Sequence, residues 1–134
     1  MDTQTLLGKI KDDFPELKIT NGRKYAFRPP RTIIIGLGEE HDSLLLLHEL
    51  GHALCGHRDF RTDAQRLRME REAWGKAREL AKRYNIDFDE VAMECELDTY
   101  REWLDKQSRC PSCKLTRYQT PDGNYHCPRC ENLT

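Results

Sequence analysis

Apolar residues recur at helical spacing in four stretches of the chain, a pattern that gives each α-helix one buried side. The stretches cover residues 3–14, 44–54, 62–84 and about 88–107. Pro15 follows the first stretch, and Gly56 follows the second. Asp42 or Ser43 can cap the second helix, and Asp87 can cap the fourth. The chain is therefore predicted to contain four helices.

Residues 17–36, between the first two helices, carry the pattern of strands and turns. Tyr25 and Phe27 alternate with polar residues, and residues 32–35 form a β-branched run that is typical of a strand. The Asn-Gly pair at 21–22 is a hairpin-type turn signal. This segment predicts a short antiparallel or mixed sheet, so the expected fold class is α+β.

The fourth helix carries two neighbouring apolar stripes. One stripe comprises Phe88, Val91, Ala92, Cys95 and Trp103, and the other comprises Met93, Leu97, Tyr100 and Leu104. A helix that is apolar over such a wide arc is expected to be buried on two sides. Cys55 and Cys95 are then expected to be small core residues.

Composition and charge exclude several classes of protein. The 134 residues suit one compact domain with a small appendage. Charged residues make up 34% of the chain but leave a net charge of only −1, so no bulk charge points to nucleic acid or a membrane surface. The first residues lack the apolar core of a signal peptide, and no apolar run approaches the roughly 20 residues of a membrane span. We expect a cytoplasmic protein without a membrane partner.

The sequence HELGH at residues 48–52 is the strongest chemical signal. His48 and His52 are four residues apart, so a helix places both imidazoles on one side, one turn apart, where they can share a metal ion. Glu49 lies beside the first histidine and can reach a water molecule on the metal, as a general base does. Gly51 leaves room for close packing behind the site. The segment predicts a catalytic zinc site.

A catalytic zinc site of this kind needs a third protein ligand. His57 is disfavoured, because a continued helix would turn it away from the metal and it follows His52 by only five residues. Glu70 falls on the apolar stripe of the next helix, where a carboxylate is costly unless it has a partner. Glu72 falls on the polar side. We expect Glu70 to be the ligand, with Glu72, or neither glutamate, as the alternatives.

The C-terminal segment, residues 108–134, carries two CPxC units separated by 13 residues, with a Pro-Asp-Gly turn signal at 121–123 between them. Four thiolates at this spacing complete a closed, structural zinc site, and the turn predicts a hairpin. The cysteines are Cys110, Cys113, Cys127 and Cys130. We therefore expect two domains, residues 1–107 and a zinc ribbon at 108–134.

The ribbon has a weak charge bias. Four basic and two acidic residues give +2, which the −2 of a zinc tetrathiolate cancels. Tyr118 and Tyr125 can stack on bases, but they can equally pack within the hairpin. A protein-contacting or stabilising ribbon is favoured over one that binds nucleic acid.

The segments HELGHALCGH and MEREAWGKARELA together resemble the ImmA/IrrE-type metallopeptidases of the gluzincin group. The resemblance covers roughly residues 30–84. It implies a small zincin-like (minigluzincin) fold, with His48, His52 and Glu70 as zinc ligands and Glu49 as the base. It also implies a protein or peptide substrate, which in that family includes helix-turn-helix repressors of phages or mobile elements.

The expected activity is zinc-dependent hydrolysis of a peptide bond, with two zinc ions, one catalytic and one structural. Tyr100 is either a group that stabilises the oxyanion or, as the pattern favours, a core or interface tyrosine. One alternative is a non-enzymatic regulatory or adaptor protein that keeps the zinc fold as a sensor or scaffold. Another is a nucleic-acid-binding ribbon protein in which HELGH is only structural.

Overall fold

The computed structural model describes residues 1–131, so the last three residues of the predicted ribbon lie outside the described residues. The elements, in chain order, are α1 (Thr3–Asp13), β1 (Lys18–Asn21), β2 (Ala26–Arg28), β3 (Thr32–Ile35), α2 (Asp42–Leu54), α3 (Asp63–Arg83), α4 (Glu90–Ser108), β4 (Tyr118–Gln119) and β5 (Tyr125–His126). The predicted α+β class is confirmed, and the four predicted helices are present.

The helix starts differ in part from the prediction. α3 begins directly after its N-cap residue Thr62, which forms a capping box with Gln65. Neither candidate caps α2: its N-cap position is His41, whose side chain makes no capping bond. The Asp42 carboxylate instead accepts hydrogen bonds from backbone amides of the preceding loop, at Gly38 and Glu39. In α4 the cap is Asp89, two residues after the predicted one, so the helix starts at residue 90.

The first three strands form a mixed sheet in the order β1-β3-β2. β1 pairs parallel with β3, and β2 pairs antiparallel with β3. The Asn-Gly turn at 21–22 therefore does not join neighbouring strands, because β3 lies between the two strands that it separates. This arrangement leaves β2 at one edge of the sheet.

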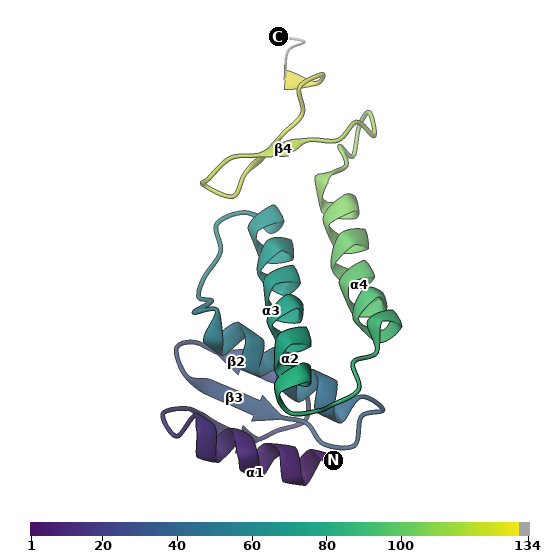
Figure 1. Ribbon diagram of the computed structural model, residues 1–134. Coiled ribbons are helices and arrows are strands. Elements are labelled where there is room, and N and C mark those ends of the chain that lie inside the picture. Colours follow the sequence, from purple (N-terminus) through teal and green to yellow (C-terminus); the bar gives the residue numbers. More distant parts are fainter. Residues whose placement is uncertain (132–134) are drawn as a thin grey trace.

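α2 is the central helix, packed between the sheet and α3 (Figure 1). Gly51 allows α2 and α3 to approach closely, because a Cβ at this position would lie 2.3 Å from the carbonyl oxygen of Ala73. The largest fully buried side chains come from α1, β3, α2 and α3; they are Leu6, Ile10, Ile33, Leu46, Leu47, Leu50 and Trp74. The core thus fixes α2 and α3 against each other, and these are the helices that carry the predicted metal ligands.

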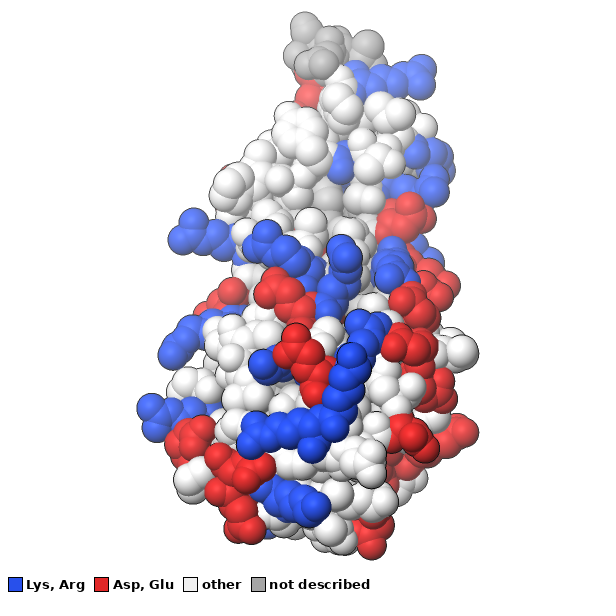
Figure 2. Space-filling model, in the orientation of Figure 1, with Lys and Arg blue, Asp and Glu red and all other residues white. Residues whose placement is uncertain are grey.

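α4 returns alongside α3 and is buried on one side only (Figure 1). Met93 and Leu97 face the core, whereas Val91 is 72% exposed and Cys95 is exposed. The predicted burial on two sides is therefore wrong, because α4 packs on α3 along one side and leaves Val91 and Cys95 exposed. Cys55 is also exposed, so neither lone cysteine is a core residue. The outer side of α4 is acidic, as the red surface at the right of Figure 2 shows.

The C-terminal segment packs on the start of α3. β4 and β5 form the predicted hairpin, and Gly123 takes a positive φ in its turn. The backbone amide of Asp63 donates to the side chain of Gln119 at 2.6 Å, and the Tyr125 hydroxyl donates to the Asp63 carboxylate at 2.6 Å. Within residues 1–131, none of the helices combines the length and apolar character needed to cross a membrane.

Candidate metal centres

α2 aligns His48 and His52 one turn apart, as the helical period requires. Both imidazoles are buried, with exposed fractions of 7% and 8%. Trp74 of α3 stacks on the His48 ring with 4.3 Å between ring centroids. Phe27 of β2 lies parallel to the His52 ring at 6.1 Å. Aromatic rings therefore restrict the orientation of both histidines.

Glu70 enters the same space from α3. Its Oε2 lies 2.9 Å from Nε2 of His48 and 3.2 Å from Nε2 of His52, and the two Nε2 atoms are 3.2 Å apart. The glutamate is 8% exposed, in agreement with its predicted place on the apolar stripe. Three donor atoms of metal-binding type thus converge on one point from two helices.

The spacing of these atoms suits zinc. Tetrahedral ligands at the usual zinc distances of about 2.0–2.1 Å are separated by roughly 3.3–3.4 Å. The three observed separations lie between 2.9 and 3.2 Å, so the donors need to open only slightly around an ion. Glu49 lies farther out, with its Oε1 3.8 Å from Nε2 of His48. His48, His52 and Glu70 could therefore hold the ion, with Glu49 beside it.

Burial and hydrogen bonds set the pKa values of the residues in this cluster. Burial lowers the pKa of His48, which favours the neutral imidazole that a metal requires. Burial opposes the charge on Glu70, but hydrogen bonds from His48 and His52 outweigh it and hold the pKa of this carboxyl well below its usual range. Burial raises the pKa of Glu49 to about 7, so this carboxyl can both accept and return a proton near neutral pH.

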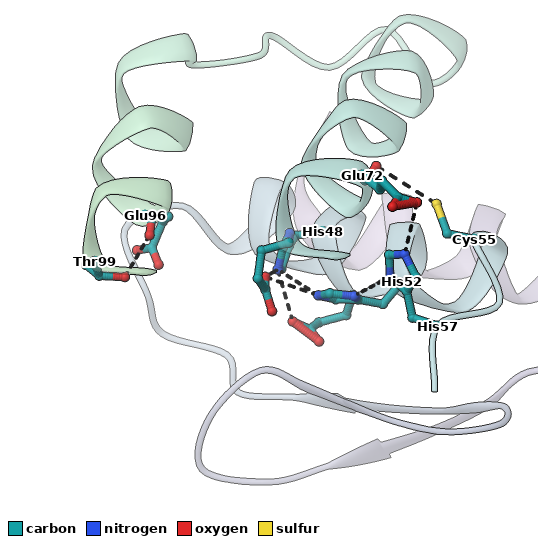
Figure 3. Close-up of polar contacts among 9 residues, drawn as sticks. His48, His52, Cys55, His57, Glu72, Glu96 and Thr99 are labelled. Atoms are coloured by element: carbon teal, nitrogen blue, oxygen red, sulfur yellow. Dashed lines mark hydrogen bonds and ion pairs between the residues drawn. The ribbon is translucent and has the colours of Figure 1, made fainter. Parts of the chain in front are cut away.

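His57 lies beside His52, on the side of that residue away from His48 (Figure 3). Gly56, with φ of +68°, ends α2 and turns the chain so that the His57 amide donates to the His52 carbonyl. Nδ1 of His57 then lies 2.8 Å from Nδ1 of His52. Nε2 of His57 lies 3.5 Å from the Glu72 carboxylate. The sequence pattern did not predict this contact, because it depends on how the chain turns after the helix.

Glu72 and Tyr100 take different places around the site. The Glu72 side chain is 50% exposed and contacts His57 rather than the two histidines of α2. Tyr100 of α4 is half-buried in the wall of a pocket of about 320 Å³ that opens onto His48, Glu49 and Glu70. Burial raises the pKa of Tyr100 to about 12, and the Glu70 carboxylate adds to the rise. Its hydroxyl therefore stays protonated and can donate a hydrogen bond into the pocket.

The four C-terminal cysteines form a second cluster. Their sulfur atoms all lie within 4.8 Å of one another. The Sγ atoms of Cys110 and Cys130 are 3.7 Å apart, and those of Cys113 and Cys127 are 3.5 Å apart. A tetrahedral zinc with Zn–S bonds of about 2.3 Å separates its sulfurs by roughly 3.8 Å. The cluster can therefore hold one metal ion in a closed tetrathiolate site.

The electrostatics of the thiols favour a cation between them. Backbone amides of Cys113 and Ser112 lower the pKa of Cys110 to about 6. Hydrogen bonds with the three neighbouring cysteines raise the pKa of Cys130 to about 12, and the negative charge of Cys110 adds to the rise. Four thiolates at these separations thus need a positive ion to neutralise them.

No family model, curated protein or solved structure matches this chain.

Proposed function

We propose that the protein is a zinc-dependent metallopeptidase with a minigluzincin-like catalytic domain of the ImmA/IrrE type. The observation that carries the proposal is the convergence of Glu70 of α3 with His48 and His52 of α2 inside a pocket that Glu49 also lines. Two histidines, a carboxylate and an adjacent glutamate form the set of groups that zinc-dependent hydrolysis of an amide uses.

Zinc held by the three ligands would supply an activated water molecule and polarise the substrate carbonyl. The residues of the chain handle the protons. Glu49 takes a proton from the attacking water and returns it to the leaving amine. Its buried position supports this role, because a carboxyl with a raised pKa both accepts and releases a proton readily. The hydroxyl of Tyr100 is the donor that we assign to the developing oxyanion.

The substrate in this proposal is a peptide in an extended conformation. β2 is an edge strand of the sheet, and its residues Ala26 and Phe27 line the pocket next to the histidines. An edge strand offers unpaired backbone groups that can hydrogen-bond an added strand. A peptide paired with β2 would pass over α2 with its carbonyl groups near Glu49. A helix-turn-helix repressor of a phage or mobile element is the substrate that the family resemblance suggests.

The ribbon is assigned a structural role. It contacts α3 through Asp63, Gln119 and Tyr125, so two of its polar side chains are engaged with the rest of the protein. This packing supports a stabilising or protein-contacting ribbon over a nucleic-acid reader.

Peptide cleavage tests the proposal directly. Zinc-loaded protein is incubated with a diverse peptide mixture, and the products are identified by mass spectrometry. We expect defined internal cleavage that Glu49→Gln abolishes while the fold and the zinc content stay unchanged. Equal cleavage by wild type and Glu49→Gln would assign the activity to a contaminant. Absence of cleavage with both zinc ions bound would support the sensor or adaptor alternative.

A further inference from the structure

Arg66 occupies an unusual position at the wall of the pocket. Its guanidinium carbon lies 5.5 Å from the ring centroid of Phe60, 5.4 Å from that of Tyr100 and 5.0 Å from that of Trp103. One ring comes from the loop before α3 and two come from α4. Three aromatic contacts of this kind hold a cation in place and partly desolvate it.

This cation has no carboxylate partner among residues 1–131. Several other arginines of the same helices are paired with carboxylates, among them Arg78 with Glu90, and Arg101 with Glu94 and Asp98. The position one turn after Arg66 is occupied by Glu70, the natural partner on a helix. The Glu70 carboxylate, however, points to His48 and His52.

α4 does not supply a partner either, although it is strongly acidic. Its six acidic residues are Glu90, Glu94, Glu96, Asp98, Glu102 and Asp105. α4 meets Arg66 through Tyr100 and Trp103 instead, and its acidic surface appears at the edge of the molecule in Figure 2. The fold therefore surrounds Arg66 with rings and keeps the nearby carboxylates away from it.

Positive charge exceeds negative charge in the pocket once the proposed zinc ion is included. The pocket is lined by Arg58 and Arg66 as well as by Glu49 and Glu70. The two carboxylates face the site where we propose a zinc ion, whose double charge offsets theirs. Two arginines remain for whatever enters the pocket. The N–H donors of a guanidinium lie in the plane of the group, and a carboxylate can accept two of them at once.

We propose that Arg66 is a receptor for a carboxylate of the bound peptide, so that the substrate class is an acidic peptide. The carboxylate belongs to an Asp or Glu side chain near the cleaved bond, or to the C-terminus of the peptide. This inference rests on the proposed function, since it treats the pocket as a peptide site.

The first test compares matched peptides. The cleaved sequences from the mixture are resynthesised as pairs that differ only in Glu or Gln at one position, with blocked termini. For wild type we expect kcat/KM to favour the Glu peptide by about 10- to 100-fold at one position, as a charge-assisted hydrogen bond implies. Arg66→Gln should reduce this preference to about one, and Arg66→Lys should retain part of it, because a lysine keeps the charge but not the bidentate geometry. Arg68→Gln, at a 70% exposed side chain on the same helix, is the matched control and should retain the preference.

A purely structural role for Arg66 predicts a different pattern. Arg66→Gln would then slow both members of a pair equally and leave the Glu preference unchanged, which overturns the proposal. The same peptides are also made with a free C-terminus, and if Arg66 dependence appears only for these, the carboxylate is that of the chain end.

A binding measurement separates this inference from the proposed function. Fluorescence anisotropy on Glu49→Gln protein compares two labelled peptide pools, one with a single Glu and one with Gln at the same degenerate positions. Preference for the Glu pool that Arg66→Gln removes supports the carboxylate site even if wild type cleaves nothing. Cleavage without any Glu preference overturns the carboxylate site and leaves the peptidase proposal in place. No cleavage and equal binding of both pools overturn both.

Discussion

The side chain of His57 lies with its Nδ1 2.8 Å from Nδ1 of His52, whereas His48 lies beside Nε2, on the other edge of that ring. If His52 binds a metal through Nε2, its proton resides on Nδ1 and is donated to His57. His57 then carries its own proton on Nε2, which points to the Glu72 carboxylate 3.5 Å away. The pair thus fixes the tautomer and the orientation of a proposed ligand.

The first prediction concerns this contact. Replacing His57 with Phe removes the acceptor, so we expect the zinc affinity of the HELGH site to fall about 10- to 100-fold. Competition with a chromophoric chelator measures the affinity. His57→Asn, which keeps an acceptor near the Nδ1 position, should recover part of the loss, and the ribbon zinc should be unaffected. Equal affinities for wild type and His57→Phe would show that the contact does not support the ligand.

The second prediction concerns the approach of α2 to α3. Gly51→Ala would place a methyl group 2.3 Å from the Ala73 carbonyl oxygen, a backbone atom that cannot move aside cheaply. We expect a loss of about 1–3 kcal/mol in the free energy of unfolding, as in other overpacked cores. Zinc binding should weaken as well, because Ala73 belongs to the helix that carries Glu70. Urea unfolding and zinc titration measure the two effects.

Gly75 provides the control for this substitution. It lies in the middle of α3 with no atom near the place where a Cβ would stand. Gly75→Ala should therefore stabilise the protein, by up to about 1 kcal/mol from helix propensity. A similar destabilisation by both substitutions would mean that steric contact at position 51 is not the cause.

The third prediction separates the two metal sites by their effect on folding. Cys113→Ser removes one thiolate from the ribbon cluster, where bound zinc contributes folding free energy on the order of 10 kcal/mol. We expect this variant to melt at a lower temperature or to aggregate. Glu49→Gln should melt at the same temperature as wild type, because Glu49 is not one of the proposed zinc ligands. The reverse order of melting temperatures contradicts the assigned roles.

Local patterns predicted much of this structure. The spacing of Trp74, Ala77 and Ala81 placed Glu70 on the buried side of its helix, and the structure has it there, because helical phase depends only on neighbouring positions. The hairpin of the ribbon was equally local, because its turn signal lies between the two CPxC units.

The predictions that failed depend on contacts between distant segments. Whether Asn21-Gly22 joins paired strands depends on where β3 inserts. The exposure of Val91 and Cys95 depends on which side of α4 finds a neighbour. The aromatic cluster around Arg66 joins a loop to α4, so no local period indicates it.

Zinc content per chain in Glu70→Gln and Glu72→Gln decides whether Glu70 is the third ligand of the HELGH site. Both substitutions keep the shape of the side chain and remove its charge. Glu70 lies within 3.2 Å of both histidine Nε2 atoms, whereas Glu72 is half-exposed and contacts His57 and Arg68 instead. By elemental analysis of freshly purified protein, we predict about two zinc ions for wild type and for Glu72→Gln, and about one for Glu70→Gln. Retention of both ions by Glu70→Gln together with loss of one by Glu72→Gln would mean that Glu72, and not Glu70, is the ligand.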